Sequence, residues 1–81
     1  MDRIVKEEMV LGHECTLWEY DDCYDLRVER DDGSSVIDVE FSKQGAVVPY
    51  EEDCGINKPP TTKQHFRWVI WAQDLIEQQN N

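Results

Sequence analysis

The chain has 81 residues and carries 18 Asp and Glu side chains against eight Lys and Arg, a net charge of −10. This length predicts one domain over residues 1–81, and the charge argues against direct binding of nucleic-acid phosphates, which needs basic side chains gathered on one face. Without a long apolar run or an apolar N-terminal stretch, we expect no membrane span, no signal peptide and a cytoplasmic protein.

The first candidate element runs from residue 3 to residue 11. Its apolar side chains fit neither the helical nor the strand period: Ile4, Val5, Met9 and Val10. We favour a strand over a short helix, because the segment 10–13 has Gly12 where a hairpin turn into the next strand would need it.

The segment 15–20 is rich in strand-forming residues, and Asp21 and Asp22 follow it as a turn. A two-residue turn would put Leu17 inside and Trp18 on the solvent face. One more turn residue would reverse this, because a slip of one residue flips every side chain of a strand. The sequence leaves both registers open, and an outward Trp18 among carboxylates would be an aromatic anchor for a partner.

Two half-buried strands are predicted over 24–30 and 36–41, joined by the turn 31–35. Their alternation predicts an antiparallel hairpin with four apolar side chains toward the helix: Leu26, Val28, Ile37 and Val39. A turn at 42–45, a short strand at 46–48 and a polar connection over 50–60 complete this half of the chain.

The segment 61–79 has the clearest period in the chain and predicts an amphipathic helix. Thr61 and Gln64 have the spacing of a capping box. One broad stripe faces the core: His65, Trp68, Val69, Trp71, Ala72, Leu75 and Ile76. The fold class expected is α+β, a three- or four-stranded antiparallel meander packed on one C-terminal α-helix.

Phe66 and Ile70 depart from this stripe. They lie one turn apart on the polar side of the helix, close enough to form a joint apolar patch. The interpretation we favour is that another part of the chain covers them. The alternative is a contact surface for a second chain.

Acidic side chains are the most informative feature of the sequence. Alternation projects four of them from the same face of two neighbouring strands: Asp25, Glu29, Asp38 and Glu40. Others extend the negative field at turns: Asp21, Asp22, Asp31, Asp32, Glu51, Glu52 and Asp53. Like charges on adjacent strands destabilise a sheet, and Arg27 relieves only part of this. One interpretation is a solvated face that serves solubility; the other is a surface that imitates the phosphate array of a nucleic acid.

No metal, cofactor or catalytic residue is predicted. The candidate ligands lack the local spacing of a zinc site: His13, Cys15, Cys23, Cys54 and His65. Three cysteines are an odd number without a secretory signal, so we expect free thiols. There is no nucleophile elbow, no phosphate loop and no paired histidine motif, so an enzyme is disfavoured.

In size, charge and α+β character, the whole chain resembles the small acidic proteins that phages use against host defence, such as anti-CRISPR and anti-restriction proteins. The resemblance implies a stoichiometric inhibitor whose partner is a basic protein that normally binds DNA or RNA. The alternatives are a small adaptor or homodimer that uses Phe66 and Ile70, with Trp18, and, ranked last, a minor enzyme or metal protein.

Overall fold

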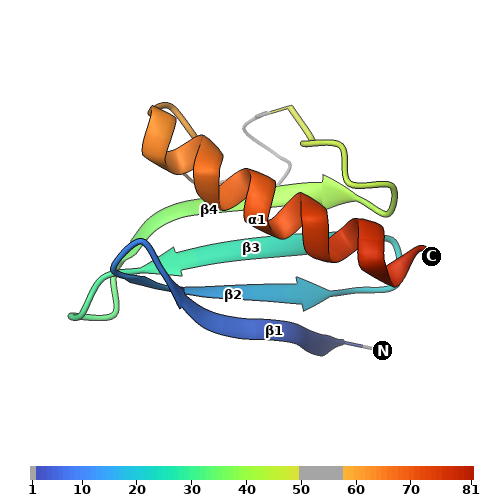
Figure 1. Cartoon of the computed structure of the whole chain (residues 1–81), viewed down its shortest axis with the longest axis horizontal. Coiled ribbons are helices and arrows are strands. Elements are labelled where there is room, and N and C mark those ends of the chain that lie inside the picture. Colours follow the sequence, from blue (N-terminus) through green and yellow to red (C-terminus); the bar gives the residue numbers. More distant parts are fainter. Residues whose placement is uncertain (1, 50–57) are drawn as a thin grey trace.

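Four strands follow one another in an antiparallel meander, and a single helix crosses one face of the sheet (Figure 1). The computed structural model describes residues 2–49 and 58–81. The elements in this part are β1 (Arg3–Val10), β2 (His13–Glu19), β3 (Cys23–Glu29), β4 (Ser35–Ser42) and α1 (Lys63–Gln79). The strand order is β1-β2-β3-β4, so the α+β meander with one C-terminal helix is confirmed, with four strands.

Strand β1 explains why the segment 3–11 fitted neither period. Its register against β2 shifts between Ile4 and Lys6, which marks a β-bulge. The extra residue changes the phase of the alternation. Ile4 and Met9 therefore lie exposed on one face, while Val5 and Val10 pack against the core on the other.

Tight turns join the first three strands. Between β1 and β2, Leu11 has φ 53° and Gly12 has φ 81°, the left-handed pair that matches the twist of a two-residue hairpin. Between β2 and β3, the Tyr20 N–H donates to the Cys23 carbonyl oxygen at 2.8 Å, which leaves a two-residue turn at 21–22. Of the two registers that the sequence left open, the structure has the one that buries Leu17.

The core lies between the inner face of the sheet and one side of α1. The sheet contributes Cys15, Leu17, Tyr24, Leu26, Val28, Ile37, Val39 and Phe41, and the helix contributes Trp68, Val69, Ala72 and Ile76. The four side chains expected to face the helix all do so. Trp71 and Leu75 are only partly buried, at the margin of this core.

The helix begins one residue later than the capping box predicted from Thr61 and Gln64. Thr62 is the N-cap, and its hydroxyl oxygen accepts from the His65 N–H at 3.1 Å. The imidazole Nδ1 of His65 accepts from the Thr61 N–H at 3.0 Å and lies 3.4 Å from the Thr62 nitrogen. An imidazole thus replaces the Glu or Gln side chain of the usual box, so the expected Gln64 pairing was wrong.

The interpretation that Phe66 and Ile70 are covered was also wrong. Phe66 is 47% exposed and Ile70 is 56% exposed. The physical reason is the two-layer architecture, because the sheet packs on the opposite side of α1.

The two edges of the sheet differ. At the outer edge of β4, Val47 forms an isolated bridge with Phe41, and the Lys58 carbonyl oxygen accepts from the Asp38 N–H at 3.0 Å. The predicted strand at 46–48 is reduced to this bridge. In the described residues, β1 pairs only with β2. Residues 50–57, and with them Glu51, Glu52, Asp53 and Cys54, lie outside the described part of the chain.

We expect Trp68→Ala to lower the free energy of unfolding by about 3–5 kcal/mol, because its ring is 1% exposed and its loss leaves a cavity. The indole Nε1 also donates to the Val10 carbonyl oxygen at 2.9 Å. Phe66→Ala, on the solvent side of the same helix, is the matched control and should change stability by less than about 1 kcal/mol. Urea denaturation followed by far-UV circular dichroism measures both. Equal losses would show that the core is not where the structure puts it.

Candidate functional site

The face of the sheet opposite α1, which we call the open face, carries five of the predicted site residues. Because Leu17, Leu26, Val28, Ile37 and Val39 point toward the helix, their sequence neighbours point the other way. These outward side chains are Trp18, Asp25, Arg27, Glu29, Asp38 and Glu40. The structure therefore confirms the shared face of the four carboxylates predicted on β3 and β4.

Strand pairing arranges the open face in rows that run across the sheet. Ile4, Trp18, Asp25 and Glu40 are consecutive partners in one row. The next row contains Thr16, Arg27 and Asp38, and a third contains Met9, Glu14 and Glu29. Side chains of direct partners have Cβ atoms about 5 Å apart, so neighbours within a row are in reach of each other.

Arg27 is the only basic residue of β3, and its contacts lie toward the C-terminal end of that strand. The Arg27 Nε forms an ion pair with the Glu29 Oε1 at 2.9 Å, and its Nη2 donates to the Gly33 carbonyl oxygen at 3.4 Å. In residues 2–49 and 58–81, no Lys or Arg forms an ion pair with Asp25 or Glu40. These two carboxylates face each other across the strands with no cation between them.

The environment of Asp25 disfavours its charged form. Burial raises the pKa of this carboxyl from 3.8 to about 6, and the negative charges of Asp38 and Glu40 act in the same direction. Arg27 offsets only part of this rise in pKa. The folded protein thus keeps at neutral pH a carboxylate that destabilises it.

The remaining predicted residues lie elsewhere. Asp21 and Asp22 are at the β2–β3 turn, and Asp31 and Asp32 are at the β3–β4 turn, at opposite ends of a seven-residue strand. That separation is about 20 Å. Asp32 has a local structural role, because it accepts from the Ser34 N–H at 2.9 Å and from its hydroxyl at 2.6 Å. Phe66 and Ile70 lie on the far side of α1, so they are not part of the open face.

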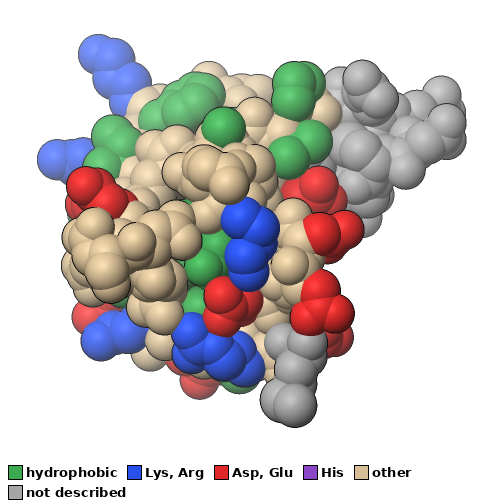
Figure 2. Space-filling view, turned by 90° about the vertical axis from the view of Figure 1, so that its right-hand side faces the viewer, with side chains coloured by type: hydrophobic (Ala, Val, Ile, Leu, Met, Phe, Trp, Pro, Cys, Tyr) green, Lys and Arg blue, Asp and Glu red, His purple; other side chains and the backbone are tan. Residues whose placement is uncertain are grey.

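A polar cluster that the sequence did not indicate closes the end of the molecule beside the β2–β3 turn. The carboxylate of Glu19 accepts from Arg3 at 2.6 Å, from Lys43 at 3.1 Å and from the Tyr24 hydroxyl at 3.1 Å. The bonds from Lys43 and Arg3 lower the pKa of Glu19 to about 2. Figure 2 looks onto this end, where basic side chains flank an acidic one and further acidic side chains gather toward the right. This cluster joins strands, turn and helix, and we assign it a structural role.

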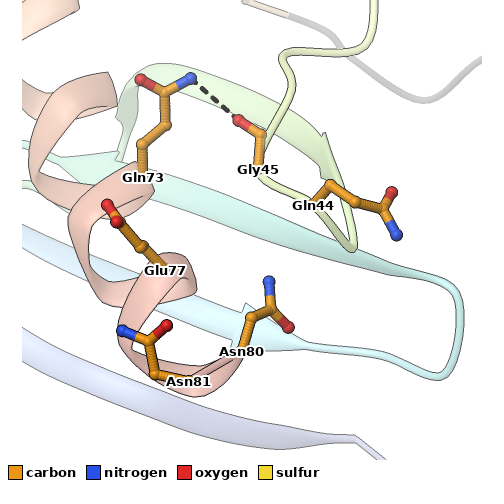
Figure 3. Close-up of a pocket in the computed structure, with 6 residues that line it drawn as sticks. All are labelled: Gln44, Gly45, Gln73, Glu77, Asn80 and Asn81. Atoms are coloured by element: carbon orange, nitrogen blue, oxygen red, sulfur yellow. Dashed lines mark hydrogen bonds between the residues drawn. The ribbon is translucent and has the colours of Figure 1, made fainter.

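A hollow of about 470 Å³ lies between the C-terminal part of α1 and the turn after β4 (Figure 3). Its lining is almost entirely amide: Gln44, Gly45, Gln73, Glu77, Asn80 and Asn81. The Gln73 Nε2 donates to the Gly45 carbonyl oxygen at 2.9 Å, and the Asn80 Nδ2 donates to the Lys43 carbonyl oxygen at 2.8 Å. These bonds hold the turn against the helix. The lining offers no nucleophile and no acid–base pair.

Cys15 lies in the core, Cys23 is half-buried on the open face, and the imidazoles of His13 and His65 lie beside the ring of Trp68. Burial raises the pKa of both Cys15 and Cys23 to about 11, so both are protonated and poor nucleophiles at neutral pH. The rings of His13 and His65 lie 5.2 Å and 6.0 Å from that of Trp68. Within the described residues, no three His, Cys, Asp or Glu side chains converge as ligands of a metal do.

None of the described helices has the length and apolar content of a membrane span. Neither a protein-family model nor a curated protein nor a solved structure matches this chain. The case for function therefore depends on the geometry of the open face.

We expect Asp25→Asn to stabilise the protein at pH 7.5 by about 1 to 2 kcal/mol. Below pH 3.8 this carboxyl is protonated in both the folded and the unfolded chain, so no penalty exists there. The penalty grows as the pH rises toward 6 and is complete above it. The stabilisation should therefore vanish near pH 3.5.

Thermal melts of both proteins at several pH values measure this effect. Glu29→Gln is the matched control, and it should not stabilise because it removes the ion pair with Arg27. A gain for Asp25→Asn that does not depend on pH would contradict the assigned cause.

Proposed function

We propose that the protein is a stoichiometric inhibitor that binds a basic, nucleic-acid-handling protein through its open face. The observation that carries this proposal is the pair Asp25 and Glu40, which face each other beside the aromatic ring of Trp18 and form no ion pair with a Lys or Arg of the described residues. In this proposal the protein is not an enzyme, and it meets its partner in the cytoplasm.

The charge geometry suits a groove built for phosphates. Neighbouring strands are about 4.8 Å apart, so carboxylates in one row form a dense array of negative charge on a rigid surface. Grooves that bind nucleic acid are lined by Lys and Arg, and a complementary acidic surface is steered into them at high rate. The resemblance to small acidic phage inhibitors, including anti-CRISPR and anti-restriction proteins, agrees with this partner class.

Solubility alone does not explain the arrangement. A net charge of −10 exceeds the magnitude of roughly 2–8 that keeps a small domain soluble. Solubility also does not require acids to stand opposite each other, where repulsion destabilises the sheet. Burial is the largest cause of the raised pKa of Asp25, and the charges of Asp38 and Glu40 add to it, so the charged form of this carboxyl is disfavoured in the fold.

We expect the double variant Asp38→Lys/Glu40→Lys to abolish capture of the partner from cells that contain it. Capture by the unchanged protein should be released by salt, because added salt shortens the Debye length and weakens the attraction between exposed charges. Asp74→Lys/Glu77→Lys changes the net charge equally on exposed positions of α1 and serves as the matched control.

Pull-downs washed at low and at high salt, followed by displacement of bound DNA or RNA from the captured protein, measure the effect. Equal capture by both double variants would refute a role for the open face.

A second candidate function is supported by the exposure of Phe66 and Ile70 on α1. Two side chains supply far less than the roughly 800 Å² per partner of a stable interface. This patch therefore favours a weak homodimer or adaptor contact rather than a permanent assembly.

If the protein dimerises through this patch, its mass in sedimentation equilibrium should rise with concentration, and Phe66→Ser/Ile70→Ser should keep it monomeric. The double variant should stay folded, since both side chains already face solvent. A constant monomer mass for the unchanged protein at millimolar concentration, together with unchanged partner capture by the double variant, would eliminate this candidate.

A further inference from the structure

One row of the open face grades from apolar to acidic across the sheet. Ile4, which is 43% exposed, is paired with Trp18; Trp18 is paired with Asp25, and Asp25 with Glu40. Each step is one strand spacing, about 4.8 Å. An aliphatic group, an indole and two carboxylates therefore stand side by side along one line.

We infer that this row is the seat of a single arginine side chain of the partner, with the guanidinium stacked on Trp18 and hydrogen-bonded to Asp25 and Glu40. This inference rests on the proposed function and names the group that the open face recognises. The aliphatic stem of the arginine would lie toward Ile4.

Arginine fits this row better than lysine for three reasons. Its guanidinium is planar, so it can stack on an indole while its edge donates to carboxylates in the same plane. It carries five N–H donors in a fixed fork, enough for carboxylates on two neighbouring strands. It is also more weakly hydrated than an ammonium group, so less water must be removed at a partly buried carboxylate.

The seat has no competing cation of its own in the described residues. Arg27, the nearest base on β3, is ion-paired with Glu29 and reaches the Gly33 carbonyl oxygen. Lys43, in the turn after β4, lies over the ring of the buried Tyr24 and is bonded to Glu19 and to the Tyr20 carbonyl oxygen. An incoming guanidinium therefore replaces water, not an internal ion pair.

Binding at this seat should be linked to a proton. Titratable and charged groups face Asp25 from each neighbouring element: Tyr20 of the β2–β3 turn, Cys23 and Arg27 of β3, and Asp38 and Glu40 of β4. Burial raises the pKa of Asp25 to about 6, the charges of Asp38 and Glu40 add to this rise, Arg27 opposes it, and a bound guanidinium would lower it. Affinity should therefore strengthen as the pH rises through 6, the range where the free protein still holds the proton.

The test uses the full chain and two fluorescent peptides, octa-arginine and octa-lysine, with binding followed by anisotropy. We expect the arginine peptide to bind roughly fivefold more tightly. Trp18→Leu should lose this preference while it still binds octa-lysine, because the carboxylates remain. Phe66→Leu, an exposed aromatic on the other layer, is the matched control and should keep the preference.

The pH dependence of binding distinguishes the contribution of Asp25 from that of the other acidic residues. Between pH 7.5 and 5, the affinity of the unchanged protein for octa-arginine should fall by roughly tenfold, and Asp25→Asn should lose most of this dependence. Far-UV circular dichroism confirms that each variant is folded.

The outcomes distinguish the two proposals. Equal affinity for both peptides, with Trp18→Leu unchanged, would overturn the arginine seat and leave the acidic open face as a general surface for bases. Absence of binding to either peptide, together with equal partner capture by the two charge-reversal variants, would overturn the proposed function as well.

Discussion

The packing of α1 on the inner face of the sheet is the constraint on which the rest of the structure depends. Trp68 lies at its centre, with its indole N–H bonded to the end of β1 and two imidazole rings against it. A domain this small has material for one core only. Because the helix and the inner face of the sheet use most of the large apolar side chains, the second face of the sheet is left mainly to polar side chains, with Ile4, Met9 and Trp18 as exceptions. The acidic open face is thus a consequence of the two-layer architecture.

Two carboxylates, those of Glu19 and Asp25, have opposite effects on the stability of the fold at neutral pH. Glu19 accepts hydrogen bonds from three donors, and its pKa falls to about 2. Asp25, on the neighbouring strand β3, is half-buried and faces Glu40, and its pKa rises to about 6. The first carboxylate stabilises the fold at neutral pH and loses that contribution as the pH falls from 4.5 toward 2, whereas the second opposes folding above pH 6. The fold surrounds Glu19 with donors but leaves Asp25 in an environment that disfavours its charge. This contrast favours a functional reason for the acidic open face.

Much of the fold and part of the candidate site were predictable from sequence, because alternation in β3 and β4 fixes which side chains share a face. Which face of the sheet Trp18 occupies was not predictable, because a change of one residue in the length of the following turn reverses it. The bulge in β1 masked the period of that strand, so Ile4 and Met9 were not assigned to the open face. The histidine in the capping box has no common sequence signature. The contacts of Glu19 join residues distant in the chain, and no local pattern indicates them.

The unequal edges of the sheet limit how this molecule can aggregate. An unpaired edge strand is a template for another strand, and a sheet with two such edges can grow without end. In the described residues, the outer edge of β4 is partly occupied by the chain segments at Val47 and Lys58, whereas β1 pairs only with β2. Strand addition through β1 would join two copies about a twofold axis and use the unpaired edge of each. The partly occupied edge of β4 would then disfavour further growth of the sheet into a fibre.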